Sequence, residues 1–268
     1  MDSIKQALDL SRATQNGATR PGTGGADPAQ AVRRASQPLE VALNETHLEQ
    51  MRIVSHGVGT PYGRYYDMLR TQVLQEMDKG SWQFLAVTSP TVGCGKTVTA
   101  CNLAMSIARL PERLVLLVDL DMRKPMVADY LGLRGEPGII SVLQERNTLV
   151  SALIEASIGP SKLLFLPGQV AGPTSSEWMA SKAMTSLLQT LKRDFRSRIV
   201  IFDLPPMLIG DDVISVLPRM DAVLLVAGVG MTSLSDIKEC QKHLQRSNVL
   251  RVVVNKVSEG MDDYHAYY

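Results

Sequence analysis

The sequence predicts an α/β fold with a doubly wound, mostly parallel sheet and helices on both of its faces. From about residue 82 onward, short β-branched runs alternate with segments that could form helices. The runs are almost continuously apolar, as is typical of parallel strands that are buried on both faces. With 268 residues, 45% of them hydrophobic, the chain is long enough to bury one sizeable core.

The chain is expected to begin with a disordered leader, residues 1–40. Residues 13–40 are rich in Gly, Pro, Ala and polar residues and carry almost no large apolar side chains, so they cannot bury enough surface to offset ordering entropy. Residues 1–12 could form a short amphipathic helix, which would be marginal in water by itself. The folded domain is then expected over residues 41–260, followed by a flexible tyrosine-rich tail, residues 261–268.

Six apolar runs are expected to form the strands of the sheet. They are "FLAVTS" (84–89), "RLVLLVDLD" (113–121), "KLLFLP" (162–167), "RIVIFDLP" (198–205), "AVLLVAGV" (222–229) and "LRVVVNKV" (250–257). Open sheets of this kind bind ligands beyond the carboxyl ends of their strands. The segments to inspect are therefore 88–97, 119–125 and 203–212.

Composition excludes several classes of protein. The chain has 28 Lys and Arg residues against 27 Asp and Glu residues, so it lacks the broad cationic surface that attracts nucleic acid. Its three cysteines, Cys94, Cys101 and Cys240, offer neither a disulfide framework nor a CxxC metal pair. Its apolar runs are far shorter than the roughly 18–20 residues that span a bilayer, and the amino terminus lacks a signal pattern. We expect a cytoplasmic protein.

The stretch "SPTVGCGKTVTACNLA" (89–104) has the form of a phosphate-binding loop that leads into a helix. Backbone N–H groups around Gly93 and Gly95 can cradle phosphate oxygens, Lys96 can supply charge, and the Thr97 hydroxyl can bind magnesium. Pro90 occupies the position of the first glycine in the usual pattern. The loop must therefore turn differently at its start, but the most important donors follow later.

Three aspartates stand at the ends of predicted strands. Asp119 and Asp121 are two residues apart in "LLVDLDMRKP", and Asp203 ends the run "VIFD". Carboxylates beside a phosphate-bound Mg²⁺ are what phosphoryl transfer needs, because that chemistry is mostly positioning and charge neutralisation. The alternative interpretation is that these acids only cap the helices that follow.

Together, "TSPTVGCGKT", "LVLLVDLDMRKP" and "IVIFDLPPMLIGDDV" resemble the Walker A, Walker A′ and Walker B motifs of the bacterial tyrosine kinases, or BY-kinases, a deviant-Walker group of P-loop ATPases in capsule and exopolysaccharide assembly. The D-x-D-x-R-x-P form of the middle motif is the most specific of the three. Similarity extends to "LPGQVAGPTSSEWMAS" (166–181), "MLRTQV" (68–73) and "VVVNKV" (252–257), and covers roughly residues 60–268.

The resemblance implies a role for each matching residue. Lys96 would hold the β- and γ-phosphates of ATP, and Thr97, Asp119 and Asp203 would hold Mg²⁺, the two aspartates directly or through water. Asp121 would be the base or a second metal-side carboxylate, with Arg123 as its positioning partner. Asn255 would contact the adenine base, and the nucleotide would be surrounded by Gly93, Cys94, Gly95, Lys96, Thr97, Val98, Arg123 and Asn255.

Three of the seven tyrosines, Tyr264, Tyr267 and Tyr268, lie in the last five residues. BY-kinases carry such a cluster and phosphorylate it between subunits, so the resemblance implies that these are the phosphoacceptors of an autokinase. The alternative is an aromatic end that packs on its own domain. Cys94 could be redox-sensitive at a helix amino terminus, but we interpret it as a small residue that suits the loop.

One family motif is altered. Where the family has E-x-x-R-x-x-R, which helps to close a ring of subunits, this chain has Arg64, Asp67 and Arg70. The resemblance implies a homo-oligomer, a separate inner-membrane copolymerase or chain-length regulator as activator, and peripheral recruitment of the chain to the inner face of the membrane. The alternatives are a nucleotide-switched ATPase that binds such a partner without phosphorylating tyrosine, and a regulatory subunit that hardly turns over.

Overall fold

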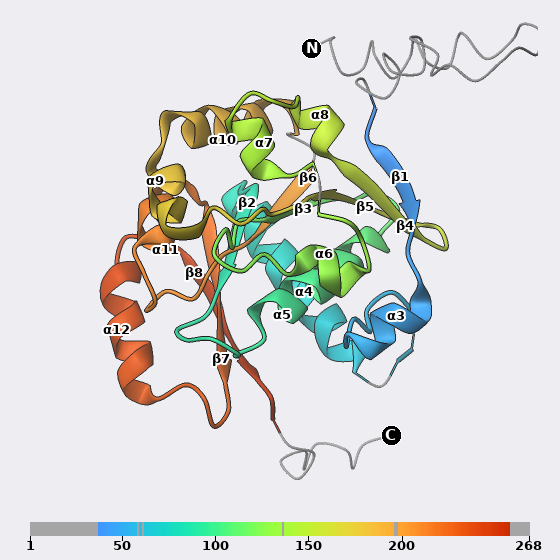
Figure 1. Cartoon of the computed structure of the whole chain (residues 1–268). Helices are drawn as coiled ribbons and strands as arrows, with labels where there is room; N and C mark the ends of the chain where they lie inside the picture. The colour runs from blue at the N-terminus through green and yellow to red at the C-terminus, as the bar shows by residue number, and fades with distance from the viewer. Residues whose placement is uncertain (1–36, 58, 61, 136, 196–197, 258–268) are drawn as a thin grey trace, which may run out of the picture.

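The computed structural model describes residues 37–57, 59–60, 62–135, 137–195 and 198–257. They form an eight-stranded sheet with the order β1-β4-β5-β3-β6-β2-β7-β8, shown in Figure 1. All neighbouring strands are parallel except for the antiparallel pair β4 and β5. The predicted doubly wound, mostly parallel sheet is confirmed. Its strands are β1 (Leu39–Ala42), β2 (Phe84–Thr88), β3 (Leu114–Asp119), β4 (Ile154–Ile158), β5 (Ser161–Leu166), β6 (Arg198–Asp203), β7 (Ala222–Gly228) and β8 (Val249–Asn255).

The six predicted runs correspond to β2, β3, β5, β6, β7 and β8. Strands β1 and β4 were not predicted, because their sequences "LEVA" and "IEASI" are short and contain polar residues. Strand β1 begins at Leu39, so the last two residues of the expected leader belong to the sheet. Residues 1–36 of the expected leader lie outside the described residues.

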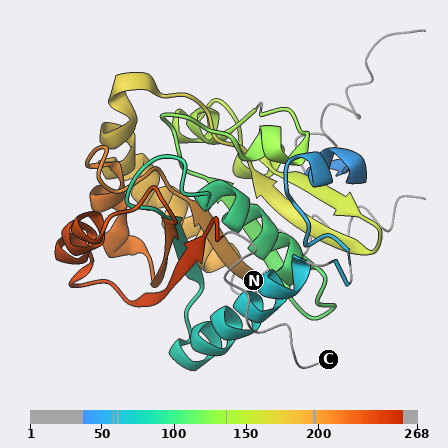
Figure 2. The ribbon, with the colours of Figure 1, turned by 90° about the horizontal axis from the view of Figure 1, so that it is seen from below.

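The helices cover both faces of the sheet. They are α3 (Glu45–Gln50), α4 (Gly63–Gly80), α5 (Lys96–Ala108), α6 (Val127–Leu131), α7 (Ile139–Leu143), α8 (Leu149–Ala152), α9 (Ser175–Ala180), α10 (Lys182–Asp194), α11 (Asp212–Val216) and α12 (Leu234–Leu244). One core packs α3, α4, α5 and α6 against the sheet, and the other packs α7, α9, α10, α11 and α12 against the opposite face. Figure 2 shows α4 and α5 side by side on the first face.

Helix α5 is central to the first core, since its residues from Thr99 to Ile107 are all buried. Such a helix cannot shift without disturbing the packing on every side. Its first residue is Lys96, so the core fixes the position of the phosphate-loop lysine. Within the described ranges, no helix has both the length and the apolarity needed to cross a lipid bilayer.

Three neighbouring strands bring the sequence motifs together. Strand β6 lies between β3 and β2, and its last residue, Asp203, is in register with Asp119 of β3 and with Val87 of β2. Because these strands are parallel, their carboxyl ends meet at one edge of the sheet. The three segments singled out in the sequence therefore converge there.

Candidate active site

The phosphate loop joins β2 to α5 and turns through two glycines. Gly93 has φ +78° and Gly95 has φ +92°, a region in which residues with a Cβ are strained. The Asn255 side chain also lies so close to Gly95 that a Cβ there would be 2.1 Å from its Nδ2 atom. Glycine is therefore required at these two positions. The loop leads directly into the amino terminus of α5, where backbone N–H groups favour the binding of a phosphate.

Pro90 occurs where the backbone does not need a glycine. Among the described residues with positive φ, the loop contributes only Gly93 and Gly95. The Pro90 carbonyl accepts a hydrogen bond from Leu208 N–H at 3.1 Å, and the Ser89 carbonyl accepts one from Met207 N–H at 2.8 Å. The start of the loop is thus anchored to the segment that follows Asp203, and proline is compatible with that conformation.

Lys96 lies among the carboxylates at this edge. Its Nζ atom is 2.8 Å from Asp121 Oδ2 and 3.5 Å from Asp203 Oδ2. The Thr97 hydroxyl donates to Asp203 Oδ2 at 2.7 Å. The structure therefore brings together Lys96, Thr97, Asp121 and Asp203, which come from motifs up to about a hundred residues apart in the sequence.

The charges at this edge do not balance. Asp119 and Asp203 are fully buried and Asp121 nearly so, while Lys96 is the one cation in direct contact with them among the described residues. Burial and the nearby Asp203 raise the pKa of Asp119 to about 8, and burial also raises the pKa of Asp203. Burial lowers the pKa of Lys96, but Asp203 and Asp121 outweigh it and raise that pKa to about 12. Buried oxygen ligands with excess negative charge suit a divalent cation such as Mg²⁺.

Asp119 shapes the loop that carries Asp121. Its Oδ1 accepts the Asp121 N–H at 3.0 Å, and its Oδ2 accepts the N–H groups of Met126 and Val127, each at 3.1 Å. With both oxygens engaged, contact through water is the more accessible of the two modes predicted for Asp119 at a metal ion. Asp119 therefore stabilises the loop that follows β3, and it is also a candidate ligand of the metal ion.

Arg123 does not pair with the residue that was expected. Its Nε and Nη2 atoms lie 2.8 and 2.7 Å from Asp212 Oδ2, and the Ser175 hydroxyl donates to Asp212 Oδ1. The prediction that Arg123 positions Asp121 directly is therefore corrected, since Asp121 pairs with Lys96. Asp212 and Ser175 were missed, although both lie in motif segments, because nothing in the sequence marks them as partners of an arginine.

Asn255 braces the phosphate loop. Its Nδ2 donates to the Cys94 carbonyl at 2.9 Å, and its Oδ1 accepts the Lys256 N–H at 2.8 Å. The contact with adenine implied by the resemblance stays a prediction beside this observed role. Cys94 is buried, with its Sγ atom 3.3 Å from Thr232 Oγ1. Burial raises the pKa of the Cys94 thiol, but hydrogen bonds with Thr232 and Thr91 outweigh it and lower that pKa.

Val98 and the altered helix motif have structural partners. The Val98 carbonyl accepts a hydrogen bond from Asn102 in the first turn of α5. Asp67 accepts from Arg70 and Arg109, each at 3.0 Å, and from Ser106 at 2.5 Å, so these charges tie α4 to α5. Arg64 stacks on the Tyr65 ring at 4.9 Å. The predicted role of Arg64, Asp67 and Arg70 in a subunit ring stays a prediction, as does the homo-oligomer.

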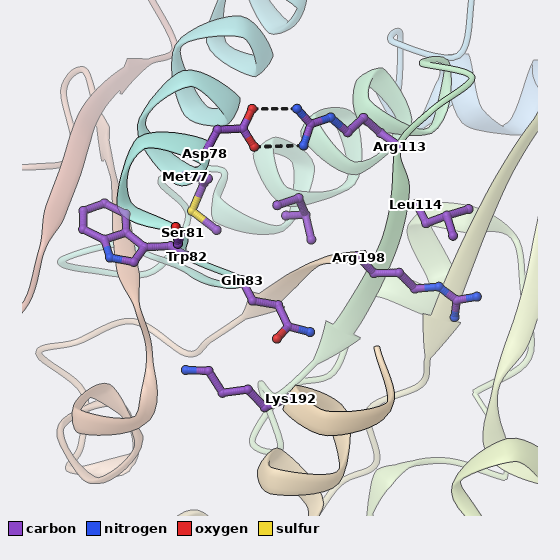
Figure 3. A pocket seen from close by; sticks show the side chains of 10 residues that line it. Met77, Asp78, Ser81, Trp82, Gln83, Arg113, Leu114, Lys192 and Arg198 are labelled. Carbon is purple, nitrogen blue, oxygen red and sulfur yellow. Dashed lines mark hydrogen bonds and ion pairs between the residues drawn. The ribbon is translucent and has the colours of Figure 1, made fainter. Parts of the chain in front are cut away.

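The predicted phosphoacceptors Tyr264, Tyr267 and Tyr268 lie outside the described residues. A hollow of about 390 Å³ at the other edge of the sheet is lined by none of the predicted site residues. Figure 3 shows Arg113 and Asp78 paired at this hollow, and its Lys192 pairs with Asp221 at 2.7 Å. Two of its three cations are thus already paired with carboxylates. The motif carboxylates and the phosphate loop lie at the carboxyl edge, which is the candidate active site.

The chain is similar to known bacterial tyrosine kinases. The chain is 28% identical over 206 residues to the tyrosine-protein kinase CpsD of Streptococcus pneumoniae, covering 76% of this chain and 88% of that protein. It is 32% identical over 181 residues to the EpsB protein of Ralstonia solanacearum, where the match covers 68% of this chain but only 24% of EpsB. The chain thus spans about a quarter of the length of EpsB.

Solved structures agree in fold. The BceF tyrosine kinase domain superposes with a TM-score of 0.68 and 25% identity, covering 87% of this chain and 98% of that one. The VpsO kinase domain gives 0.64 and 26%, with coverage of 78% and 98%. These likenesses confirm the resemblance to bacterial tyrosine kinases. Residues 85–266 match the model of the CobQ/CobB/MinD/ParA nucleotide binding domain, and the chain belongs to that family.

Proposed function

We propose that this protein is an ATP- and Mg²⁺-dependent protein-tyrosine kinase whose acceptors include Tyr264, Tyr267 and Tyr268. One observation carries the proposal: three neighbouring strands place Lys96 and three buried carboxylates at the mouth of a phosphate loop. Phosphoryl transfer needs positioned charge more than any covalent group from the protein. This edge offers that arrangement.

Each residue at the edge has a distinct task in the proposed reaction. Lys96 leaves its carboxylate partners to bind the β- and γ-phosphates, since the phosphates carry more charge than either partner. Thr97 and Asp203 would hold Mg²⁺, with Asp119 behind them, and the ion would supply positive charge beside the phosphates. Asp121, freed from Lys96, accepts the proton of the attacking tyrosine hydroxyl.

Tyrosine as the acceptor is supported by the relatives and by the chain itself. CpsD of Streptococcus pneumoniae and YwqD of Bacillus subtilis are both named tyrosine-protein kinases. The last five residues of this chain contain three tyrosines. From the same resemblance we propose that the kinase regulates capsule or exopolysaccharide biosynthesis and export.

We further propose that the chain forms a homo-oligomer and acts at the inner face of the membrane. A separate inner-membrane copolymerase or chain-length regulator would recruit and activate it there. The support is the resemblance to the BY-kinases. Strong turnover by the purified chain alone would contradict the need for such an activator.

The test is mass spectrometry of the carboxy-terminal peptide after production of the full chain with its membrane partner, beside a Lys96→Ala variant. Phosphate on Tyr264, Tyr267 or Tyr268 in the unaltered chain alone is the expected result. An unmodified tail with continued release of ADP would instead identify a nucleotide-switched ATPase. ATP binding without ADP release would identify a regulatory subunit.

A further inference from the structure

Two cations follow the candidate base in the chain and face solvent. Arg123 and Lys124 come directly after the Asp121-Met122 pair, and both are exposed. The Lys124 N–H donates to Asp121 Oδ1 at 3.0 Å, so the backbone that carries these cations lies against the carboxylate. Positive charge therefore borders the point at which an acceptor hydroxyl would meet Asp121.

Arg123 is held rigidly. Asp212 is only 2% exposed, and its Oδ2 atom binds the Nε and Nη2 atoms of Arg123. Its Oδ1 atom accepts a hydrogen bond from the hydroxyl of the fully buried Ser175. Gly210 also lies against this ion pair, since a Cβ at that position would be 2.6 Å from Arg123 Nη2 and 2.8 Å from Asp212 Oδ2. A guanidinium fixed in this way loses little further side-chain entropy when it binds an anion.

One edge of this guanidinium remains available. Within the described part of the chain, the Nη1 atom of Arg123 has no hydrogen-bond partner, and the side chain is 37% exposed. Lys124 likewise has no carboxylate within ion-pair distance among the residues that the structure describes. By contrast, Arg113, Lys162 and Lys192 each hold a carboxylate. Arg123 and Lys124 can therefore bind an anionic group of a ligand.

The sequence around the proposed acceptor supplies such groups. Asp262 and Asp263 directly precede Tyr264 in "MDDYHAYY", a segment outside the described residues. Buried carboxylates outnumber Lys96 at the active edge, so an acidic peptide would be repelled unless cations stood at the entrance. Adjacent residues of an extended chain are about 3.3–3.6 Å apart, so acids one and two residues before a tyrosine lie close to that tyrosine. Arg123 and Lys124 are likewise only two and three residues after Asp121 in the chain.

We infer that Arg123, fixed by Asp212 and Ser175, acts with Lys124 to select acceptor tyrosines that are preceded by acidic residues. The inference rests on the proposed kinase function and names the substrate class of the same site. Asp212 and Ser175 are positioning residues, because they act through Arg123. The preference belongs to the acceptor and leaves the affinity for ATP unchanged.

The test is a charge exchange in the full chain, read as the rate of phosphate incorporation at Tyr264 by mass spectrometry and as ATP hydrolysis. Asp262→Asn with Asp263→Asn should slow Tyr264 phosphorylation roughly three- to ten-fold, as expected for two exposed ion pairs. Lys124→Glu should do the same. The reversed tail, Asp262→Lys with Asp263→Lys, should also slow Tyr264 phosphorylation. Adding Lys124→Glu to the reversed tail should recover part of the lost rate.

Two variants serve as matched controls. Glu259→Gln removes one charge just before the tail, three residues ahead of Asp262, and Lys238→Glu reverses an exposed cation on α12; neither should alter the rate at Tyr264. An unchanged rate of Tyr264 phosphorylation after loss of Asp262 and Asp263 would overturn the inference. It would also be overturned if Lys124→Glu lowered that rate equally in the chain with its native tail and in the chain with Asp262→Lys and Asp263→Lys. A higher KM for ATP in Lys124→Glu would also overturn it, by assigning the cation to the nucleotide.

A binding measurement separates this inference from the proposed function. If the unaltered chain places no phosphate on any tyrosine, the kinase proposal fails. The full chain can still be titrated with the fluorescent peptides EGMDDYHAYY and EGMNNYHAYY. Tighter binding of the acidic peptide, lost in Lys124→Glu, supports selection of acidic segments, and equal binding of the two peptides contradicts it.

Discussion

The two edges of the central sheet both carry lysine or arginine beside aspartate, but in different states. At the carboxyl edge, the carboxylates around Lys96 are buried, the Lys96 side chain is only 12% exposed, and the negative charges exceed the positive one. At the other edge, the pair of Arg113 and Asp78 is substantially exposed, and each partner neutralises the other. The first arrangement is costly for the isolated chain, whereas the second costs and contributes little.

The difference indicates which edge is functional. Folding alone gives no reason to bury three carboxylates against a single lysine, since apolar residues of similar volume would be at least as stable. The excess charge becomes favourable when a cation and a phosphate arrive. Local instability of this kind is a common property of active sites.

The largest effect is expected from removal of a carboxylate at the carboxyl edge. Asp203→Asn should lower the rate of ATP turnover by at least about 100-fold, because it removes a charge that holds Thr97 and that we propose as a ligand of the metal. Steady-state ADP release with saturating Mg²⁺ is the measurement. Turnover within a few-fold of the unaltered chain would show that this edge is not the reaction site.

A smaller effect is expected from the buried acid that holds Arg123. Asp212→Ala should lower the free energy of unfolding by about 1–3 kcal/mol, because the Ser175 hydroxyl and Arg123 both lose their partner. Urea denaturation measures the change. The neighbouring Asp211 is exposed and its side chain makes no capping bond, so Asp211→Ala is the matched control. Equal losses in both variants would contradict the account.

The pH dependence of stability tests the buried charge of Asp119. Its pKa is raised from about 3.8 to about 8, so the folded chain binds a proton that the unfolded chain releases. The stabilising contribution is present below about pH 4 and is lost as the pH rises towards 8. In metal-free buffer, Tm should fall across that window, and Asp119→Asn should reduce the slope. An unchanged slope would refute the assignment.

The smallest effect is expected at the other edge. Arg113→Gln should change the free energy of unfolding by less than about 1 kcal/mol, since the pair with Asp78 is exposed to water. ATP turnover should equal that of the unaltered chain. If this variant disturbs turnover as strongly as Asp203→Asn, the functional contrast between the two edges is wrong.

Most of the sheet was predictable because buried parallel strands consist of apolar residues along their whole length. Strands β1 and β4 escaped prediction because both are short and contain polar residues; β1 is an edge strand, and β4 lies next to it, between β1 and β5. Lys96, Asp121 and Asp203 were predictable as neighbours because each lies at or beyond the carboxyl end of a parallel strand, and the sheet brings such ends together.

The contacts that hold the motif residues in place were not predictable. Arg123 is 89 residues from Asp212 in the sequence, and Asn255 is 161 residues from the Cys94 carbonyl that it binds. Nothing local to an arginine or an asparagine identifies so distant a partner. Only the three-dimensional positions of the loops show that the motif residues are themselves held in place.

Calorimetric titration of the full chain with ATP and Mg²⁺, beside Lys96→Ala, tests the central claim most directly, because the claim concerns where the phosphates bind. The account predicts one molecule of ATP per chain and an affinity at least about ten-fold weaker in Lys96→Ala, since a charged partner of the phosphates is lost. Equal affinity in the two proteins would show that the buried charges at the carboxyl edge do not form the nucleotide site.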